Sequence, residues 1–215
     1  MIYEPPKLQT EDLKIMDLVD QQRESIRYLT QFNPKRWTGS LRRVLFAKAV
    51  QGSNSIEGIN ADIDAAVAAI EGEPPLDEDT ETRMAIGGYR AALTYIVQAA
   101  QDQYFEFSKQ FLKSLHFLIC GYTMANQPGQ WRNGPVFVVN SKTSQVVYEA
   151  PPHESVNGFV EELITYLKGS SESALVRAAM AHLNLTMIHP FKDGNGRVAR
   201  ALQTLVIAQD GLLHP

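Results

Sequence analysis

The sequence has only one cysteine, Cys120, so no disulfide can form within the chain. It begins with neither a basic segment nor an apolar core of the signal-peptide kind, and no apolar run is long enough to span a bilayer. These absences exclude a disulfide-stapled fold and predict a cytoplasmic protein without a membrane contact. Because Cys120 lies within an apolar run, it is expected to be a buried structural thiol.

Positive charge is not in excess either. The 215 residues include 20 Lys and Arg against 24 Asp and Glu, which gives a net charge of -4. This balance disfavours broad binding to nucleic acid, so any binding of phosphate must depend on a local site. With 44% hydrophobic and 20% charged residues, the composition is typical of a globular protein with one large domain or a domain with a helical extension.

Apolar residues recur at helical spacing through most of the chain. Gly52 is expected to end the second of the predicted helices, in which Leu41, Val44 and Leu45 should face inward. Helices are predicted over residues 10–29, 39–50, 62–70, 77–99, 107–123, 155–167, 173–188 and 197–209.

One region departs from the helical pattern. Residues 136–140 and 145–148 are rich in β-branched and aromatic side chains, and a short polar segment separates them. This pattern predicts a β-hairpin. A lone hairpin is marginally stable, so it must pack on helices, either as a structural flap or with a functional role. The predicted fold class is all-α with one hairpin.

Twelve consecutive residues, His189 to Arg200, combine groups suited to polyphosphate chemistry. Their sequence is His-Pro-Phe-Lys-Asp-Gly-Asn-Gly-Arg-Val-Ala-Arg. The residue before a proline avoids the helical conformation, so the preceding helix should end near His189. Gly194-Asn195-Gly196 allows a turn whose backbone N–H groups form an anion-binding nest at the start of the next helix.

Four side chains complete this arrangement. Arg197 and Arg200, three residues apart on one helix face, can bind phosphate oxygens. Asp193 can hold Mg²⁺ together with substrate phosphates. His189 can accept a proton near neutral pH. Each feature alone is ordinary, as a structural histidine, a turn or a solvated arginine, but their occurrence together favours a functional site.

The stretch resembles the signature of the Fic (filamentation induced by cAMP) family, His-Pro-Phe-x-[Asp/Glu]-Gly-Asn-Gly-Arg-x-x-Arg, and every fixed position is present. Upstream, residues 129–132 with the hairpin and residues 148–152 resemble the flap of that family. The resemblance covers about residue 40 to the C-terminus. It implies a Fic-type helical bundle, with an N-terminal helical segment over residues 1–72 and a Fic core over 73–215 whose flap hairpin spans about 136–148.

The resemblance also implies an activity, the transfer of AMP from ATP to a Ser, Thr or Tyr hydroxyl of a target protein, with release of pyrophosphate. His189 would deprotonate the hydroxyl, Asp193 would hold Mg²⁺, and Arg200 would bind the γ-phosphate. The resemblance implies a second protein or the chain itself as the target, and family members often form homodimers. The further nucleotide-binding residues that the resemblance implies are Gly194, Asn195, Gly196, Arg197, Val147 and Tyr148.

A second stretch, Ser53-Asn54-Ser55-Ile56-Glu57-Gly58, resembles the inhibitory motif of the family, [Ser/Thr]-x-x-x-Glu-[Gly/Asn]. Ser53 and Glu57 are four residues apart, so one helical turn places them on the same face. In the family this glutamate pairs with the second signature arginine, here Arg200, and displaces the γ-phosphate. The resemblance therefore implies an enzyme that is autoinhibited in its resting state.

Other functions stay open at this point. The same glutamate is suited to orienting a water, which would make the chain a deAMPylating hydrolase, and a non-catalytic nucleotide-responsive interaction module is the third alternative. Members of the family also transfer phosphocholine, UMP or phosphate. The complete signature, including His189, favours an enzyme. Because the sequence ends soon after the signature, contacts to the adenine are expected to lie partly beyond it.

Overall fold

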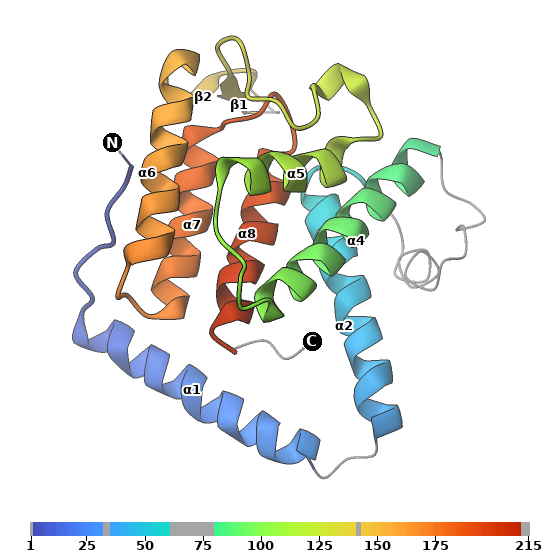
Figure 1. Ribbon diagram of the computed structural model, residues 1–215, viewed down its shortest axis with the longest axis vertical. Helices are drawn as coiled ribbons and strands as arrows, with labels where there is room; N and C mark the ends of the chain where they lie inside the picture. Colours follow the sequence, from blue (N-terminus) through green and yellow to red (C-terminus); the bar gives the residue numbers. More distant parts are fainter. Residues whose placement is uncertain (1, 32–34, 61–79, 141–142, 212–215) are drawn as a thin grey trace.

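The computed structural model describes residues 2–31, 35–60, 80–140 and 143–211, with the backbone alone at residues 29–31 and 35–42. The described residues form an all-α bundle with a single β-hairpin, which confirms the predicted fold class (Figure 1). No helix among them is long and apolar enough to cross a membrane. The helices are α1 (Thr10–Gln31), α2 (Lys35–Ile56), α4 (Thr80–Gln101), α5 (Lys109–Cys120), α6 (Val156–Gly169), α7 (Ala174–Ile188) and α8 (Asn195–Gln209), with short 3-10 turns η1 (Met124–Asn126) and η2 (His153–Ser155).

Helix α8 is the centre of the bundle. It packs against α7, α4, α5 and α2, while α6 covers α7 from outside. Val198, Leu202 and Leu205 of α8 are fully buried, and so are the small residues between them. A helix that buries residues along most of its length is typical of a position inside a core. The first residues of α8 belong to the signature, and they are therefore anchored by a helix that packs inside the core.

Helix α2 continues beyond Gly52 to Ile56, so the prediction that Gly52 ends this helix is wrong. A glycine inside a helix costs only about 1 kcal/mol relative to alanine, which tertiary contacts readily offset. Those contacts come from Ser53, which is 5% exposed and is bound by a side chain of α8. The longer helix matters because its last turn carries Ser53, the first residue of the stretch that resembles the inhibitory motif.

The buried face of α2 also differs from the expectation. Val44 and Leu45 are 41% and 55% exposed, whereas Ala47 and Val50 are fully buried. The two predicted inward positions are therefore wrong, because packing against α4 and α8 selects a different face of the helix. Leu41 lies outside the residues whose side chains are described.

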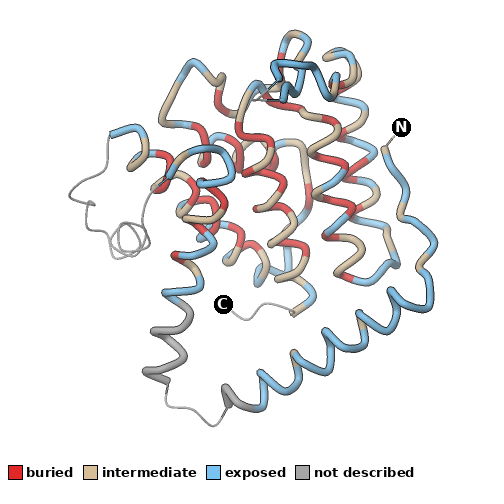
Figure 2. Tube along the Cα trace, turned by 180° about the vertical axis from the view of Figure 1, so that it is seen from behind, coloured by how far each residue is buried: buried red, intermediate tan, exposed pale blue. Residues whose placement is uncertain are grey.

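Helix α1 lies along one side of the bundle, and nearly all of it is exposed (Figures 1 and 2). The predicted helix is confirmed. Leu13, Leu18 and Ile26, which give α1 its helical spacing, are 49%, 52% and 61% exposed. One tie to the bundle runs from Arg23, whose Nη2 donates to the Gly211 carbonyl at 2.6 Å.

The remaining helices are present near the predicted positions. The helix predicted over 107–123 is shorter, since α5 ends at Cys120 and Gly121 follows. α8 begins at Asn195 rather than Arg197. The helix predicted over 62–70, the start of the helix predicted at 77, and the boundary proposed between residues 72 and 73 lie outside the described residues.

The predicted hairpin is confirmed. β1 (Phe137–Val139) pairs antiparallel with β2 (Val146–Glu149). Val138 lies opposite Tyr148 and Val139 opposite Val146, so a bulge leaves Val147 without a partner in the ladder. The Tyr148 hydroxyl donates to the Met187 carbonyl at 2.6 Å, which attaches the hairpin to the end of α7.

Candidate active site

The signature residues form the turn between α7 and α8. α7 ends at Ile188, and His189 caps it in the left-handed conformation, with φ 50° and ψ 58°. This conformation is uncommon for a residue with a Cβ, so it needs support from neighbours. Arg132 supplies that support, because its Nε donates to the His189 carbonyl at 2.8 Å. The end of the helix at Ile188, with His189 as its cap, agrees with the prediction of an end near His189.

The His189 ring has a defined orientation. Nδ1 lies 3.1 Å from the Thr186 carbonyl, which can only accept a hydrogen bond, so Nδ1 carries the proton. Nε2 is then left with a free lone pair. Burial lowers the pKa of His189 below its usual value, so the ring is neutral near pH 7. A neutral imidazole with one free nitrogen is suited to accepting a proton.

The glycine-rich turn is shaped by packing against α5. Gly194 has φ 76°, and a Cβ at this position would lie 2.4 Å from Cys120 Sγ, so both the backbone and the space require glycine. The Asn195 side chain accepts from the Phe191 N–H and donates to the Phe191 carbonyl, each at 2.9 Å. It thereby closes the turn, while the first N–H groups of α8 lack partners within the helix and remain available for the predicted nest.

Asp193 and Arg197 form an ion pair beside this turn. Arg197 is 1% exposed, and its Nη2 lies 3.2 Å from Asp193 Oδ2. Its Nη1 lies 3.4 Å from the Tyr122 hydroxyl. The buried Nε of Arg197 has no hydrogen-bond partner among the described residues. A buried donor without a partner is uncommon, and this one is available to an acceptor on a ligand.

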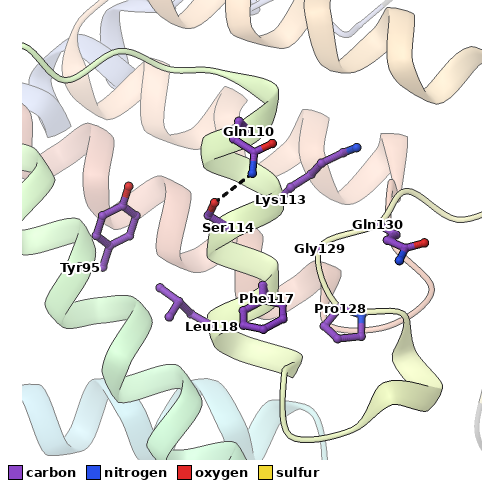
Figure 3. Close-up of a pocket in the computed structure, with 9 residues that line it drawn as sticks. All are labelled: Tyr95, Gln110, Lys113, Ser114, Phe117, Leu118, Pro128, Gly129 and Gln130. Atoms are coloured by element: carbon purple, nitrogen blue, oxygen red, sulfur yellow. Dashed lines mark hydrogen bonds between the residues drawn. The ribbon is translucent and has the colours of Figure 1, made fainter.

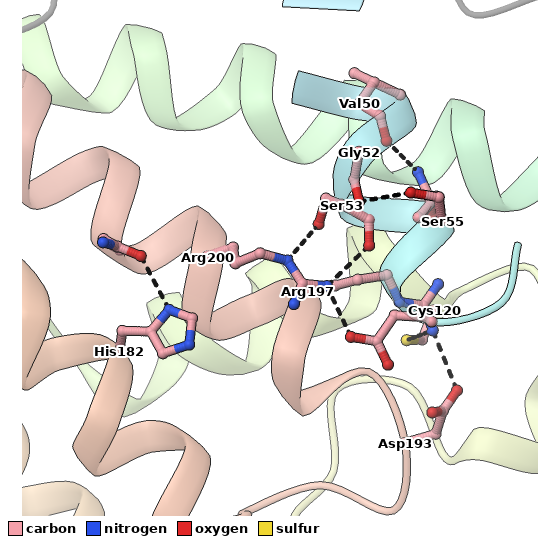
Figure 4. A network of polar contacts seen from close by, with 12 residues as sticks. Val50, Gly52, Ser53, Ser55, Cys120, His182, Asp193, Arg197 and Arg200 are labelled. Atoms are coloured by element: carbon pink, nitrogen blue, oxygen red, sulfur yellow. Dashed lines mark hydrogen bonds and ion pairs between the residues drawn. The ribbon is translucent and has the colours of Figure 1, made fainter. Parts of the chain in front are cut away.

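Arg200 faces α2 instead, and it binds Ser53 and Glu57 of the stretch that resembles the inhibitory motif. Its Nε donates to Ser53 Oγ at 2.8 Å, and its Nη2 donates to the Ser53 carbonyl at 2.9 Å. The same Nη2 lies 2.7 Å from Glu57 Oε1. Figure 4 shows Arg200 pointing from α8 toward Ser53 at the end of α2. Ser53 lies in the last turn of α2 and Glu57 in the turn just after it, so the two side chains do not share a helical face as expected, yet both contact the same guanidinium.

The Glu57 carboxylate lies directly over the start of α8. A Cβ added at Gly196 would be 2.4 Å from Glu57 Oε1 and 3.2 Å from Arg200 Nη1. Anions bind at helix N-termini because the N–H groups and the helix dipole converge there. The Glu57 carboxylate is therefore a negative group already present at this end of α8.

The flap contributes the two other predicted residues, Val147 and Tyr148. Val147 is 62% exposed at the bulge of β2. The bond from the Tyr148 hydroxyl to Met187 holds the flap two residues before His189 along the chain. The flap thus borders the turn that carries the other candidate residues.

Sequence reasoning missed His116 on α5. This side chain is fully buried and stacks on Phe191, with ring centroids 3.8 Å apart. Its Nε2 lies 3.0 Å from the Asp193 carbonyl, and its Nδ1 accepts from the Gly129 N–H at 2.9 Å. Burial lowers the pKa of His116 to about 4, so the ring is neutral with its proton on Nε2. The available signal was a histidine on an apolar helix face, four residues before Cys120.

Sequence reasoning also left the role of Arg132 unassigned beyond its place in the flap-like stretch. Arg132 is 4% exposed, and its guanidinium donates to the carbonyls of His189, Gly134 and Pro151. Its backbone N–H donates to the Pro190 carbonyl at 2.9 Å. One side chain therefore joins the flap to the turn that holds His189.

We expect Arg132→Ala to lower the free energy of unfolding by about 3 kcal/mol, because it leaves several carbonyls without their donor. Urea denaturation followed by far-UV circular dichroism measures this change. Arg27→Ala is the matched control, since Arg27 is exposed and only 3.7 Å from Glu24, and such pairs contribute less than about 1 kcal/mol. Equal stability of the two variants would contradict the role given to Arg132.

One hollow of the surface lies apart from the candidate chemistry. A cavity of about 610 Å³ is bordered by α4, α5 and residues 128–130, and Figure 3 shows Tyr95 and Phe117 at its edge. The residues that line it include none of the signature and none of the stretch Ser53 to Gly58. The functional residues converge at the start of α8 instead.

Asp193 is the residue that fits a metal ion. Its side chain is 46% exposed and offers hard carboxylate oxygens, the ligands that Mg²⁺ prefers. Within the described ranges, no group of three or more His, Cys, Asp or Glu side chains is placed to hold a metal. The donor set therefore fits a Mg²⁺ that is shared between one carboxylate and the phosphates of a substrate.

The chain is similar in sequence to parts of curated relatives. A protein adenylyltransferase Fic of Nematostella vectensis is 24% identical over 221 residues, covering 96% of this chain and 47% of the relative. A protein adenylyltransferase fic-1 of Caenorhabditis briggsae is 31% identical over 128 residues, covering 58% of this chain and 24% of the relative. The chain thus spans about half of the first relative and about a quarter of the second.

Solved structures show the same fold. A Fic family protein from Desulfovibrio desulfuricans superposes with a TM-score of 0.76 at 26% identity, covering 95% of this chain and 60% of that one. A Fic domain containing signaling protein from Bacteroides thetaiotaomicron superposes with a TM-score of 0.73 at 23% identity, covering 90% and 73%. Residues 106–207 match the profile of the Fic/DOC family. The chain therefore carries a domain of the Fic/DOC family, which includes the turn at His189 and the first part of α8.

Proposed function

We propose that the chain is a protein adenylyltransferase, which moves AMP from ATP to a hydroxyl side chain of a target protein in the cytoplasm. The observation that carries the proposal is that one turn holds two features. These are a neutral His189 whose Nε2 is free and the start of α8, where N–H groups can bind an anion. The names of the curated relatives support the same activity. The lone thiol is buried, and its pKa is raised to about 11 by burial, so it is not a rival nucleophile.

The proposed reaction is an in-line displacement at the α-phosphorus. The target oxygen attacks, its proton passes to His189 Nε2, and the bond between the α-phosphorus and the bridging oxygen breaks to release pyrophosphate. Mg²⁺ bound beside Asp193 would neutralise charge on the phosphates. His189 is held ready because Thr186 fixes its Nδ1 proton and Arg132 fixes its backbone.

The remaining candidate residues take the phosphates and the target. The N–H groups of Gly194, Asn195 and Gly196 would bind phosphate oxygens, since the Asn195 side chain is committed to Phe191. The unpaired Nε of Arg197 would donate to an oxygen of the same phosphates. Arg200 would bind the γ-phosphate. The hairpin, with Val147 exposed and Tyr148 anchored to α7, would cover the nucleotide and pair with an extended target segment.

The proposal includes autoinhibition by Glu57. Arg200 is bound by Ser53 and Glu57, so it has to leave both before it can bind a γ-phosphate. The Glu57 carboxylate also repels phosphate from the start of α8, where Gly196 lies beneath it. The resting state is therefore an enzyme whose phosphate site is blocked from within the same chain.

Positionally labelled ATP tests the transfer. The Glu57→Gly chain is incubated with Mg²⁺ and either α-labelled or γ-labelled ATP, in the presence of a cell lysate as a source of targets. We expect α-label on protein, with γ-label recovered as pyrophosphate. Label from the γ-position on protein would indicate kinase-type transfer instead, and label from neither position would favour a binding module.

Removal of AMP is a second candidate function, favoured by the position of the Glu57 carboxylate beside the proposed phosphate site. A carboxylate in that place can orient a water for attack on a phosphorus. The test uses target protein labelled by the Glu57→Gly chain, purified and then incubated with the wild-type chain. Loss of label with the wild type and retention with Glu57→Gln would establish the hydrolase, and retention with both would exclude it.

The reaction should persist in mildly acidic solution. Because burial lowers the pKa of His189, the fraction of neutral base stays high as the pH falls to about 6.5, the usual histidine value, and declines only below it. Initial rates of AMP transfer by the Glu57→Gly chain between pH 5 and 8, in about 0.15 M salt, measure this. An acid limb centred above pH 6.5 would contradict the assigned environment of His189.

A further inference from the structure

Two side chains donate hydrogen bonds to the same oxygen of the Asp193 carboxylate. Asn126 Nδ2 donates to Asp193 Oδ2 at 2.8 Å, and Arg197 Nη2 donates to the same oxygen at 3.2 Å. No other hydrogen bond to this carboxylate occurs within the described ranges, so Oδ1 keeps both of its lone pairs. The two donors therefore fix the rotation of the carboxylate and leave one oxygen for another ligand.

Asn126 is itself held in place. It is the last residue of η1, and Gln127 follows with φ 50°, an uncommon value for a residue with a Cβ. The Lys192 Nζ donates to the carbonyl of Ala125 at 2.9 Å, which ties η1 to the residue before Asp193. A turn in an uncommon conformation persists when surrounding contacts determine it.

His116 fixes the other end of the same loop. It accepts from the Gly129 N–H and donates to the Asp193 carbonyl, so one ring joins the loop after η1 to the backbone of Asp193. The side chain of Asp193 is thus oriented by Asn126 and its main chain by His116. Both supports come from residues that are far from the signature in sequence.

The neutral donor has a distinct effect beside Arg197. An arginine binds a carboxylate best through both oxygens, which would withdraw Oδ1 of Asp193 from a cation. By occupying Oδ2 at the shorter distance, Asn126 opposes that rotation without adding positive charge. Partners of this kind, which orient a metal-binding carboxylate, typically change metal affinity 10- to 100-fold when removed.

We propose that Asn126 is a positioning residue that turns Asp193 Oδ1 toward the divalent cation accompanying the nucleotide. The proposal rests on the proposed function, because it presumes that Asp193 takes a cation together with substrate phosphates. Asn126 does not touch the reacting atoms, so its removal weakens the binding of the cation and leaves the phosphate-binding groups in place.

The test measures nucleotide affinity with and without Mg²⁺, so it does not depend on turnover. Isothermal titration of the Glu57→Gly chain with α,β-methylene-ATP gives the gain in affinity that Mg²⁺ provides. We expect the additional substitution Asn126→Ala to reduce this gain about tenfold, while the affinity without Mg²⁺ and the melting temperature stay unchanged. Asn157→Ala, at an exposed position on α6, is the matched control and should keep the full gain.

Each other outcome has a separate meaning. A full Mg²⁺ gain in Asn126→Ala would overturn the positioning role, and so would an equal loss of affinity with and without Mg²⁺, which indicates general disruption. If the Glu57→Gly parent itself shows no Mg²⁺ gain, the assignment of Asp193 within the proposed function fails, and this inference with it. Asn126→Asp provides a check of opposite sign, because a second carboxylate 2.8 Å from Asp193 should increase the dependence on the cation.

Discussion

Glu57→Gly is expected to raise the rate of AMP transfer about 100-fold. The Glu57 carboxylate lies 2.7 Å from Arg200 Nη2. The side chains of Glu57 and Arg200 are 30% and 20% exposed, so solvent partly screens the pair. A close charge pair near a surface gains about 4 kcal/mol before desolvation, and a net bias of about 2.7 kcal/mol suffices to leave about 1% of the molecules competent. Initial rates of α-label transfer by the two chains, at equal ATP and Mg²⁺, measure the effect.

Glu57→Gln separates charge from volume. The glutamine keeps the size of the side chain over Gly196 but loses the ion pair with Arg200 and the repulsion of phosphate. We expect a rate between those of the wild type and Glu57→Gly. A rate equal to that of the wild type would mean that the side chain blocks by its volume alone, and equal rates in all three chains would remove Glu57 from the account.

His189→Ala should lower AMP transfer by about 10²- to 10⁴-fold when introduced into the Glu57→Gly chain. The alanine removes Nε2, the nitrogen with the free lone pair, while Thr186 merely loses one donor to its carbonyl. The effect should fall on the turnover number, because His189 is not among the proposed phosphate ligands. Single-turnover rates at saturating ATP, together with ATP affinity from calorimetry, separate the two quantities.

His182→Ala is the matched control for that variant. His182 is on the same helix, two turns before His189, and its Nδ1 lies 2.9 Å from Gln203 Oε1 on α8. Losing this contact should leave the transfer rate within about twofold, since surface substitutions away from special features change stability by only about 0.5 kcal/mol. A His189→Ala chain that remains as active as the His182→Ala chain would show that another group takes the proton.

The parts of the site that are contiguous in sequence were predictable. The turn from His189 to Arg200 follows from local rules, namely the proline after His189, the glycines and the helix that starts behind them. The meeting of Glu57 with Arg200 was predicted only through the resemblance, because 143 residues separate them. In the structure the two side chains form an ion pair at 2.7 Å, as that resemblance implied.

The parts that depend on packing were not predictable. Gly52 was expected to end α2, yet the contacts of the last turn with α8 outweigh the small preference of a single glycine. The buried face of α2 is chosen by α4 and α8, which helical spacing alone does not specify. His116 and Asn126 reach Asp193 across 77 and 67 residues, and no periodic pattern encodes contacts of that separation.

The proposed autoinhibition requires that Glu57 keeps the γ-phosphate from Arg200, and the affinities of ATP and ADP test this requirement most directly. Both nucleotides are titrated by calorimetry into His189→Ala chains, in which turnover is expected to be strongly reduced, with and without Glu57→Gly. A hydrogen bond to a charged group contributes about 1.5 to 3 kcal/mol, so we predict that ATP binds at least about tenfold more tightly than ADP only when Glu57 is absent. An equal preference for ATP in both chains would contradict the account.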